Sequence, residues 1–410
     1  MINRNGAVSA PAIRACTGPL ASHIGGFTAL LSRRGYAPNT VQAKCMLVAD
    51  LSRWLEVRGL SLDRLDQARL RQFHQDHRDR KRRGDVATGE QLLGYLRDLG
   101  CIQAPPLEVD SSPVGELIGE FARFLSSERG LSPATLINYL PIIRRFLAEQ
   151  VAGGVLHLDE LRVADIHRFI VRHAQSGSRG SAKNLVTALR SFLRFLQQRG
   201  VIVADLAGAV PGVAGWRLSH LPKTLPPEQV ERLLNSCNRA TPAGRRDYAI
   251  LLLLARLGLR GGEVVAMTLD DLDWESGEIL VRGKGQRLSR LPLPTDVGEA
   301  VVDYLRHDRP ACSTRRVFIR TRAPLRGLLG PSAICCVVCR ALKRAGLNPQ
   351  FKGAHLLRHS LATDLLRRGA SLVEIGQLLR HSQPNTTQIY AKVDIAALRA
   401  IALPWPGAVS

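Results

Sequence analysis

The chain has no apolar stretch that approaches the roughly 20 residues a membrane helix needs. Its N-terminus also lacks the apolar run of a secretory signal. Aromatic residues make up only 5% of the sequence, while hydrophobic residues make up 45%, as in ordinary globular proteins. These features exclude a membrane protein and predict a cytoplasmic one. At 410 residues the chain is long enough for two or three domains.

Metal-binding and disulfide patterns are also missing. Five of the eight cysteines are scattered singly, at Cys16, Cys45, Cys101, Cys237 and Cys312. The remaining Cys335, Cys336 and Cys339 lie in an apolar run that is typical of a helix, and no second Cys or His pair lies at zinc-like spacing. We therefore expect Cys335 and Cys339 on the buried face of a helix, and no metal site.

Acidic residues are scarce relative to basic ones. The chain has 35 Asp and Glu against 57 Lys and Arg, which gives a net charge of +22. Such an excess is typical of a protein that binds a polyanion, and nucleic acid is the leading partner, although a merely soluble basic protein is the alternative. Only eight of the basic residues are lysines. The others are arginines, which are well suited to bidentate hydrogen bonds with phosphate.

Two proline-bearing segments, 104–113 and 208–227, read as linkers, and the regions before and between them contain an internal repeat. The repeat consists of three collinear blocks, displaced by 95, 96 and 100 positions. The matched residues are Gly35, Pro38, Thr40, Val48 and Leu51 with Gly130, Pro133, Thr135, Ile143 and Phe146; Leu62, Asp63, Leu65, Leu70 and Phe73 with Leu158, Asp159, Leu161, Ile166 and Phe169; and Leu92, Leu93, Tyr95, Leu96 and Gly100 with Phe192, Leu193, Phe195, Leu196 and Gly200.

The blocks have helical periodicity, with Pro and Thr at one helix start and Gly just past another helix end. They predict two related small helical domains, at 18–103 and 114–205, with chance similarity between amphipathic helices as the alternative. A dense basic cluster lies between the second and third blocks, and we expect it to contact phosphates rather than to form only a solvated loop. Its members are Arg78, Arg80, Lys81, Arg82 and Arg83.

From Pro227 onward the pattern changes to mixed α and β. The apolar run Ile250–Ala255 predicts a buried helix. Alternating Ile279 and Val281, a Gly283–Gly285 turn and the return through Leu291 and Leu293 predict a β-hairpin.

Four motifs follow one another in this region. They are Gly258-Leu259-Arg260-Gly261-Gly262-Glu263, Arg282-Gly283-Lys284-Gly285, His355-Leu356-Leu357-Arg358-His359, and Leu378-Leu379-Arg380-His381 with Thr387 and Tyr390. Their order and spacing resemble those of the tyrosine recombinase, or phage integrase, family, over residues 225–404. The resemblance implies site-specific recombination or integration of DNA, as in transposition and other movements of mobile elements. Strands would be cut and rejoined through a 3′-phosphotyrosyl intermediate.

The resemblance also implies an architecture. We expect an α+β, mostly helical chain with a SAM-like helical domain at 1–105, a core DNA-binding domain at 114–205, a linker at 206–226 and a catalytic domain with a small β-sheet at 227–410. The first domain departs from the family's usual two-domain plan and is interpreted as a copy of the second.

The chemistry of the motif residues agrees with the resemblance. Charge builds on the nonbridging oxygens during in-line attack at a phosphate, and Arg260 and Arg358 suit its stabilisation. Tyr390 supplies the nucleophile, and since a phenol has a pKa near 10, His355 is the candidate base. Lys284 on its flexible turn is the candidate acid for the departing 5′ oxygen.

Two further residues have supporting roles in this interpretation. His381 is expected to donate a hydrogen bond to the phosphate, and Glu263 to orient its neighbours. Ser371 with Glu374 predicts a capping box for the helix that leads to His381, and Thr386 is expected to cap the short helix that carries Tyr390.

We expect no cofactor, because arginines stabilise the charge and a phosphotyrosyl bond conserves the energy of the broken ester. The expected partners are double-stranded DNA and further copies of this chain, as a dimer or tetramer on DNA that exchanges strands through a four-way junction. The tail with Val393, Ile395, Leu398 and Ile401 resembles a segment that docks on a neighbouring protomer, with packing in its own chain as the alternative. A type IB topoisomerase and a catalytically silent DNA-binding regulator are the rival functions.

Overall fold

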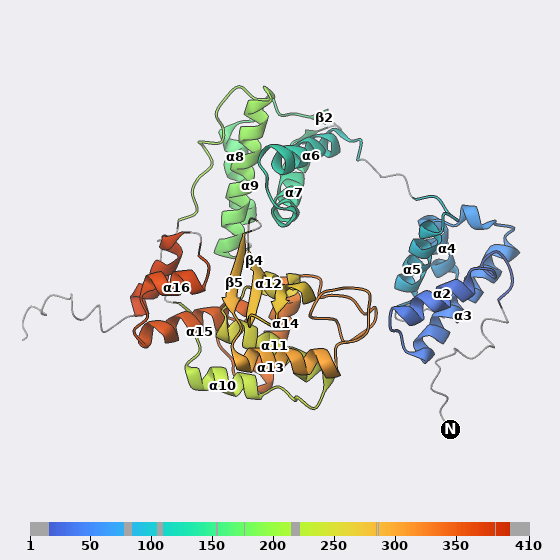
Figure 1. Ribbon diagram of the computed structural model, residues 1–410. Coiled ribbons are helices and arrows are strands. Elements are labelled where there is room, and N and C mark those ends of the chain that lie inside the picture. The colour runs from blue at the N-terminus through green and yellow to red at the C-terminus, as the bar shows by residue number, and fades with distance from the viewer. Residues whose placement is uncertain are drawn as a thin grey trace, which may run out of the picture. The chain divides into compact units, whose positions relative to one another are not determined.

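The computed structural model describes residues 16–77, 84–104, 110–152, 155–175, 177–214, 222–283, 285, 287–381 and 383–393 (Figure 1). The chain divides into two compact units, one formed by Ala104–Ser219 and the other by Met1–Gln103 together with His220–Ser410. The fold is mostly helical, with a small sheet, as the sequence predicts. The basic cluster at 78–83, Lys284, and the tail beyond Val393 lie outside the described residues.

The segment before residue 104 folds into short helices around a core of its own. Their bounds are α2 Ile24–Arg33, α3 Pro38–Val57, η1 Leu62–Arg64, α4 Gln67–Asp76 and α5 Asp85–Asp98. Pro38 begins α3, where a missing N–H costs little because the first turn of a helix has no internal acceptors for it. Asp66 caps α4 by accepting a hydrogen bond from the Arg69 N–H at 2.8 Å. The buried core includes Phe27 and Phe73.

The unit Ala104–Ser219 repeats this plan of helices. Its elements are α6 Pro113–Arg123, the π-helical turn η3 Phe124–Glu128, α7 Pro133–Ala148, β1 Val151–Ala152, β2 Val155–Leu156, α8 Val163–Ala174 and α9 Arg179–Gln198. Serine side chains cap two of the helices: Ser112 accepts from the Gly115 N–H at 3.0 Å, and Ser178 from the Ser181 N–H at 3.2 Å. The core of this unit is rich in phenylalanine, as at Phe192.

Most of the apolar positions that pair in the sequence repeat are buried in both segments. The matched buried pairs are Val48 with Ile143, Leu51 with Phe146, Leu65 with Leu161, Leu70 with Ile166, Phe73 with Phe169, Leu92 with Phe192, Leu93 with Leu193 and Leu96 with Leu196. Gly100 and Gly200, which follow α5 and α9, both have φ of 72°, a left-handed conformation that glycine adopts without steric cost. The two segments thus share buried positions and the glycine that ends the last helix.

The third segment is built around one buried helix. Its elements are α10 Pro227–Asn235, α11 Pro242–Arg256, α12 Gly261–Ala266, η4 Leu269–Asp271, β3 Leu272–Asp273, β4 Glu278–Arg282, β5 Leu288–Pro292, α13 Thr295–His307, α14 Pro331–Arg344, α15 Ala354–Arg367, α16 Leu372–Leu378 and η6 Pro384–Val393. Helix α11 contacts α10, α13, α14 and α15 (Figure 1), and most of its side chains are buried. The predicted buried helix Ile250–Ala255 is confirmed as the last turns of α11.

The sheet of this segment is antiparallel, in the order β3-β4-β5. Strands β4 and β5 form the predicted hairpin, and Ile279 lies opposite Leu291. Ile279, Val281 and Leu291 are buried, while the side chains between them point away from the core, as the period of two requires.

Two local expectations were inaccurate. Helix α14 exists, but Cys335 and Cys339 are only half-buried, because the buried stripe of Ile334, Val338 and Ala341 lies one position, or about 100°, away from them. Thr386 does not begin the segment that carries Tyr390, since η6 already begins at Pro384. All eight cysteines are free. Among the described residues, no helix is long and apolar enough to cross a membrane.

Candidate active site

A tight turn between α11 and α12 positions Arg260. Gly258 has φ of 57°, and a Cβ atom on it would lie 2.6 Å from Leu379 Cδ2, so only glycine fits here without displacement. This close approach brings the turn against the end of α16, about 120 residues further along the chain. Arg260 follows as the N-cap residue of α12. The first arginine motif and the last motif therefore meet at this turn.

Glu263 holds two arginines through a single buried carboxylate. It accepts hydrogen bonds from Arg260 Nη1 at 2.7 Å, from the Arg260 backbone N–H at 2.8 Å and from Arg380 Nη2 at 2.9 Å. Burial raises the pKa of this carboxyl, but the Arg260 backbone hydrogen bond and the Arg380 charge outweigh it, so the net shift is downward. The predicted orienting role of Glu263 has this geometric basis.

Arg380 reaches Glu263 from an unusual backbone position. It is the one non-glycine residue among those described with positive φ, at 56°. This left-handed conformation follows the C-terminus of α16, where glycine is the ordinary choice. Its side chain is buried, and its Nε lacks a hydrogen-bond partner among the described residues. The sequence reasoning gave Arg380 no role, although it lies in the last motif.

Arg358 lies deepest in the cluster. It projects from α15 and is 3% exposed, and its guanidinium donates hydrogen bonds to the backbone carbonyls of Gly258 and Leu379. Burial and the charges of Arg260 and Arg380 lower its pKa to about 10. Around these three guanidinium groups, Glu263 is the one carboxylate that pairs with them among the described residues. Three guanidinium groups and one carboxylate leave a net positive charge, which an anion of two negative charges would balance.

The motif histidines lie around the arginines at different depths. His355, in the first turn of α15, is exposed at the residue level, and burial of its ring together with Arg358 lowers its pKa. His381 lies just after Arg380, and its Nδ1 is 2.7 Å from Thr387 Oγ1. Burial and the charges of Arg358 and Arg260 lower the pKa of His381 to about 4. Both rings are therefore neutral near pH 7.

Tyr390 is buried at the edge of the cluster, and its partner is not the expected histidine. The side chain is 1% exposed, and burial raises its pKa to about 12. Its Oη lies 2.8 Å from Nδ1 of His359, one turn of α15 beyond His355. The structure gives no hydrogen bond between His355 and Tyr390 among the described residues. The signal that could have found His359 was its spacing of four from His355, which places both on one helix face.

The remaining predicted site residues cannot be placed. Lys284 lies outside the described residues, between β4 and β5, whose ends are tied by a 2.8 Å hydrogen bond from the Gly283 N–H to the Arg287 carbonyl. Nothing is described of Arg78, Arg80, Lys81, Arg82 and Arg83 either. No group of His, Cys, Asp and Glu within the described part of the chain could hold a metal ion.

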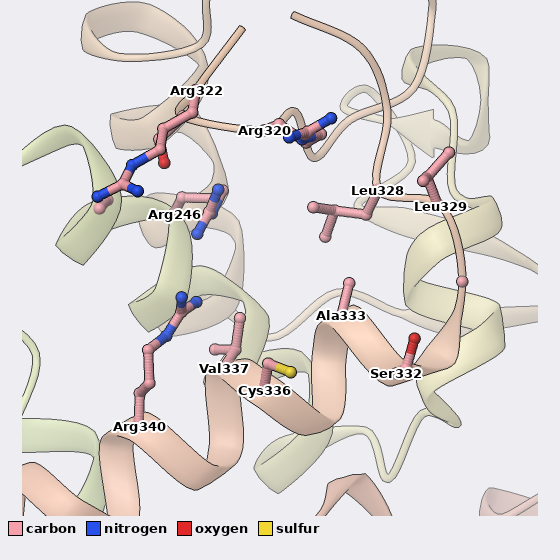
Figure 2. A pocket seen from close by; sticks show the side chains of 13 residues that line it. Arg246, Arg320, Arg322, Leu328, Leu329, Ser332, Ala333, Cys336, Val337 and Arg340 are labelled. Carbon is pink, nitrogen blue, oxygen red and sulfur yellow. The ribbon is translucent and has the colours of Figure 1, made fainter. Parts of the chain in front are cut away.

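A second basic site lies beside the first (Figure 2). A pocket of about 620 Å³ is lined by Arg246, Arg320, Arg322 and Arg340 and by apolar side chains that include Leu328 and Val337. Its lining includes residues of the first turn of α14. That turn lies close to α12, because a Cβ atom built on Gly261 would be 3.5 Å from the Pro331 carbonyl oxygen. The pocket therefore adjoins the helix that Arg260 caps.

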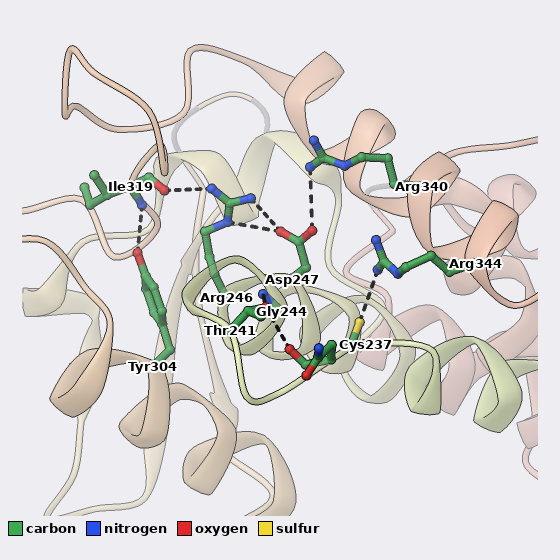
Figure 3. Close-up of polar contacts among 10 residues, drawn as sticks. Cys237, Thr241, Gly244, Arg246, Asp247, Tyr304, Ile319, Arg340 and Arg344 are labelled. Atoms are coloured by element: carbon green, nitrogen blue, oxygen red, sulfur yellow. Dashed lines mark hydrogen bonds and ion pairs between the residues drawn. The ribbon is translucent and has the colours of Figure 1, made fainter. Parts of the chain in front are cut away.

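Only one of these arginines is fixed inside the protein (Figure 3). Arg246 is 5% exposed and donates to Asp247 Oδ1 at 2.6 Å and to the Ile319 carbonyl at 3.0 Å. Arg340 is 56% exposed and lies 3.6 Å from Asp247 Oδ2. Asp247 thus carries one charge against two arginines, and the pocket remains positive.

Comparison with known proteins agrees with this arrangement. The sequence profile of the phage integrase family matches residues 223–396, and that of the phage integrase N-terminal SAM-like domain matches twice, at 24–88 and 118–200. The protein y4rA of Sinorhizobium fredii, whose name describes an integrase/recombinase, is 45% identical over 95% of both chains. The chain belongs to the phage integrase family. It is accordingly a tyrosine recombinase.

Other members of the family differ in how much of this recombinase they cover. The tyrosine recombinase XerD of Corynebacterium glutamicum is 32% identical over 69% of this chain and 94% of its own. Among solved structures, XerH recombinase bound to palindromic difH substrate matches with a TM-score of 0.54 at 20% identity, over 69% of this chain and 83% of its own. A lambda integrase dimer bound to a COC′ core site matches with a TM-score of 0.52 at 18% identity, over 72% and 99%. These structures share the fold.

Proposed function

We propose that this recombinase cuts and rejoins DNA site-specifically through a 3′-phosphotyrosyl bond between Tyr390 and a backbone phosphate. The observation that carries the proposal is the cluster in which Arg260, Arg358 and Arg380 lie around one carboxylate, with a buried tyrosine at its edge within reach of the Arg358 charge. Such preorganised donors stabilise the charge that develops on phosphate oxygens during in-line attack.

In this mechanism Arg260 and Arg358 hold the nonbridging oxygens of the scissile phosphate. Burial and repulsion from Arg260 and Arg380 lower the pKa of Arg358, and a bound phosphate relieves that repulsion. His381 contributes a neutral donor: when Nδ1 accepts from the Thr387 hydroxyl, Nε2 carries the proton and can donate it in a hydrogen bond to the phosphate.

Lys284 is proposed as the acid that protonates the departing 5′ oxygen, from the turn between β4 and β5. The arginines supply the charge stabilisation that a divalent metal supplies in other phosphoryl transfers. The phosphotyrosyl bond retains the energy of the broken ester for rejoining. The proposed reaction therefore requires neither metal nor ATP.

We propose double-stranded DNA as the partner of all three parts of the chain. A net charge of +22 supports this, and XerH, lambda integrase and the Tn1549 transposon integrase were each solved with DNA. We assign 114–205 as the core-binding domain, 206–226 as a linker and 227–410 as the catalytic domain. By analogy with the lambda integrase dimer on its core site, this chain would assemble on DNA as a dimer or tetramer, joined by its C-terminal tail.

We further propose that residues 1–105 duplicate the core-binding domain. The double match of the SAM-like profile and the shared buried positions support this. Each segment also packs a histidine, in a tilted arrangement, against the phenylalanine four residues before it, with ring centroids 4.5 Å apart for Phe73 and His77 and 4.6 Å for Phe169 and His173. XerD covers 69% of this chain but 94% of itself, which agrees with an added domain here.

Replacing the nucleophile tests the proposed function. Tyr390→Phe removes only the hydroxyl, so DNA affinity should stay within a few-fold while the covalent protein–DNA adduct disappears. Tyr248→Phe, which alters a tyrosine outside the cluster, is the matched control and should still form the adduct. The measurement is denaturing electrophoresis after incubation with a nicked target duplex.

The same proteins incubated with supercoiled plasmid and with paired target sites separate the rival functions. Recombinant product supports the proposal. Relaxation without exchange indicates a type IB topoisomerase, and binding without either indicates a silent regulator. An adduct that persists with Tyr390→Phe excludes Tyr390 as the nucleophile.

A further inference from the structure

The hydroxyl of Tyr390 makes one hydrogen bond among the described residues, to the Nδ1 atom of His359 at 2.8 Å. Their ring centroids are 5.7 Å apart, so the two rings also pack against each other. The contact joins α15 to η6, elements that also pack against each other. A buried hydroxyl with a single partner has its proton directed at that partner.

The direction of this hydrogen bond follows from charge. His355 and Arg358 flank His359 on α15, Tyr390 faces it from η6, and Lys223 and Lys352 line the same pocket of about 350 Å³. Burial, His355 and Arg358 lower the pKa of His359 to about 4, so its ring is neutral at pH 7. A neutral imidazole has one donor and one acceptor nitrogen. Because Tyr390 keeps its proton, Tyr390 Oη donates to Nδ1, and Nε2 carries the ring proton.

We propose that His359 is the catalytic base of this recombinase, which takes the proton of Tyr390 during attack. The proposal rests on the proposed function of Tyr390. The bond from Tyr390 Oη to phosphorus forms as the proton moves from Oη to Nδ1 of His359. The bond from phosphorus to the 5′ oxygen breaks, and that oxygen receives a proton from Lys284. In rejoining, the released phenolate takes its proton back from His359.

The surroundings favour this transfer once DNA is bound. A phosphate at Arg358 brings negative charge close to His359 and favours the protonated imidazole. The proton on Nε2 has an exit as well, since His359 and His355 line the same pocket. His355 does not have this geometry: its ring centroid lies 6.3 Å from that of His359, and it is His359 that meets the Tyr390 hydroxyl.

The test separates proton transfer from mere positioning. In His359→Asn, the amide oxygen can accept the Tyr390 hydrogen bond near the position of Nδ1 but cannot take up a proton near neutral pH. We expect DNA affinity within a few-fold of wild type and cleavage slower by about 10²–10⁴-fold. The rate of the variant should rise about tenfold per pH unit between pH 6 and 9, because hydroxide then replaces the base.

Two further measurements assign the defect to the nucleophile. A substrate with sulfur at the bridging 5′ position needs no protonated leaving group, so it should rescue Lys284→Ala but leave His359→Asn slow. His359→Ala opens space next to the pocket, and added imidazole should restore part of its cleavage. Recovery by imidazole also demonstrates that the variant is folded.

Three results would overturn the inference. Wild-type cleavage by His359→Asn would make His359 a positioning residue only. The steep pH dependence in His355→Asn but not in His359→Asn would assign the base to His355. Failure of imidazole to restore His359→Ala, with a thermal unfolding midpoint equal to that of wild type, would also exclude base catalysis. A failure of the proposed function is distinguishable, because it appears as an adduct formed by Tyr390→Phe.

Discussion

At the scale of single residues, Arg380 has an unfavourable backbone conformation and a favourable ion pair. A non-glycine residue in the left-handed region costs roughly 1–2 kcal/mol, and this one persists because its guanidinium pairs with the buried Glu263. The residue therefore couples the end of α16 to the start of α12. Arg260 and Arg380, the residue before His381, thus share one carboxylate.

Substituting Arg380 separates these two effects. Arg380→Ala and Arg380→Gly both remove the ion pair, but only glycine relaxes the backbone at φ of 56°. We expect both variants to be less stable than wild type, and Arg380→Gly to be more stable than Arg380→Ala by about 1 kcal/mol. Urea unfolding followed by tryptophan fluorescence measures the difference. Equal stability of the two variants would contradict the account of strain.

The sequence motifs predicted which residues share a site, and the roles assigned to those residues stay predictions. Arg260, Arg358, His381 and Tyr390 are brought together in the structure. His359 and Arg380 were missed because their roles depend on distant partners: the Tyr390 hydroxyl lies 31 positions from His359, and Glu263 lies 117 positions from Arg380. The spacing of His359 from His355 shows that the two share a helix face, but it does not show that Tyr390 is the partner of His359.

At the scale of elements, helices and the hairpin were predictable because they follow from local periodicity. The buried helix at Ile250–Ala255 and the hairpin are confirmed, and the structure adds the register, in which Ile279 lies opposite Leu291. The Arg246 pocket was not predictable, because its lining comes from three parts of the chain that meet only after folding. These parts are α11, the loop between α13 and α14, and α14 itself. Its arginines are indistinguishable in sequence from any other surface arginine.

The pocket's less buried arginines give a prediction for α14 and the loop before it. Since the pocket adjoins α12, we expect Arg320, Arg322 and Arg340 to contact phosphates next to the scissile one. Replacing Arg322 and Arg340 by Gln should weaken DNA binding and lower the slope of log affinity against log salt by about one unit for each phosphate that the variant no longer binds. Arg306→Gln, on the exposed face of α13, is the control. An unchanged slope would leave the pocket outside the DNA interface.

At the scale of the whole molecule, a third DNA-binding part would change how the recombinase holds its target. Two tandem modules of related fold can follow the duplex over a longer site than one. Each adds bound phosphates, whose counterion release makes affinity fall steeply with salt. An alternative use of the first segment is association between protomers, which would leave the salt dependence unchanged.

Neutralising the basic cluster of the first segment in the full-length chain distinguishes these uses. Replacing Arg78, Arg80, Lys81, Arg82 and Arg83 by Gln should shorten the DNA footprint and lower the salt slope by about one unit for each phosphate that the cluster binds in the wild type. Cleavage at Tyr390 on short DNA should survive, because every proposed catalytic residue lies beyond Pro227. The control replaces Arg53 and Arg64, whose guanidinium groups already pair with Asp50 and Asp63. Loss of tetramers with an unchanged slope would assign the segment to association between protomers, whereas unchanged footprint, slope and assembly would make the cluster a solvated loop.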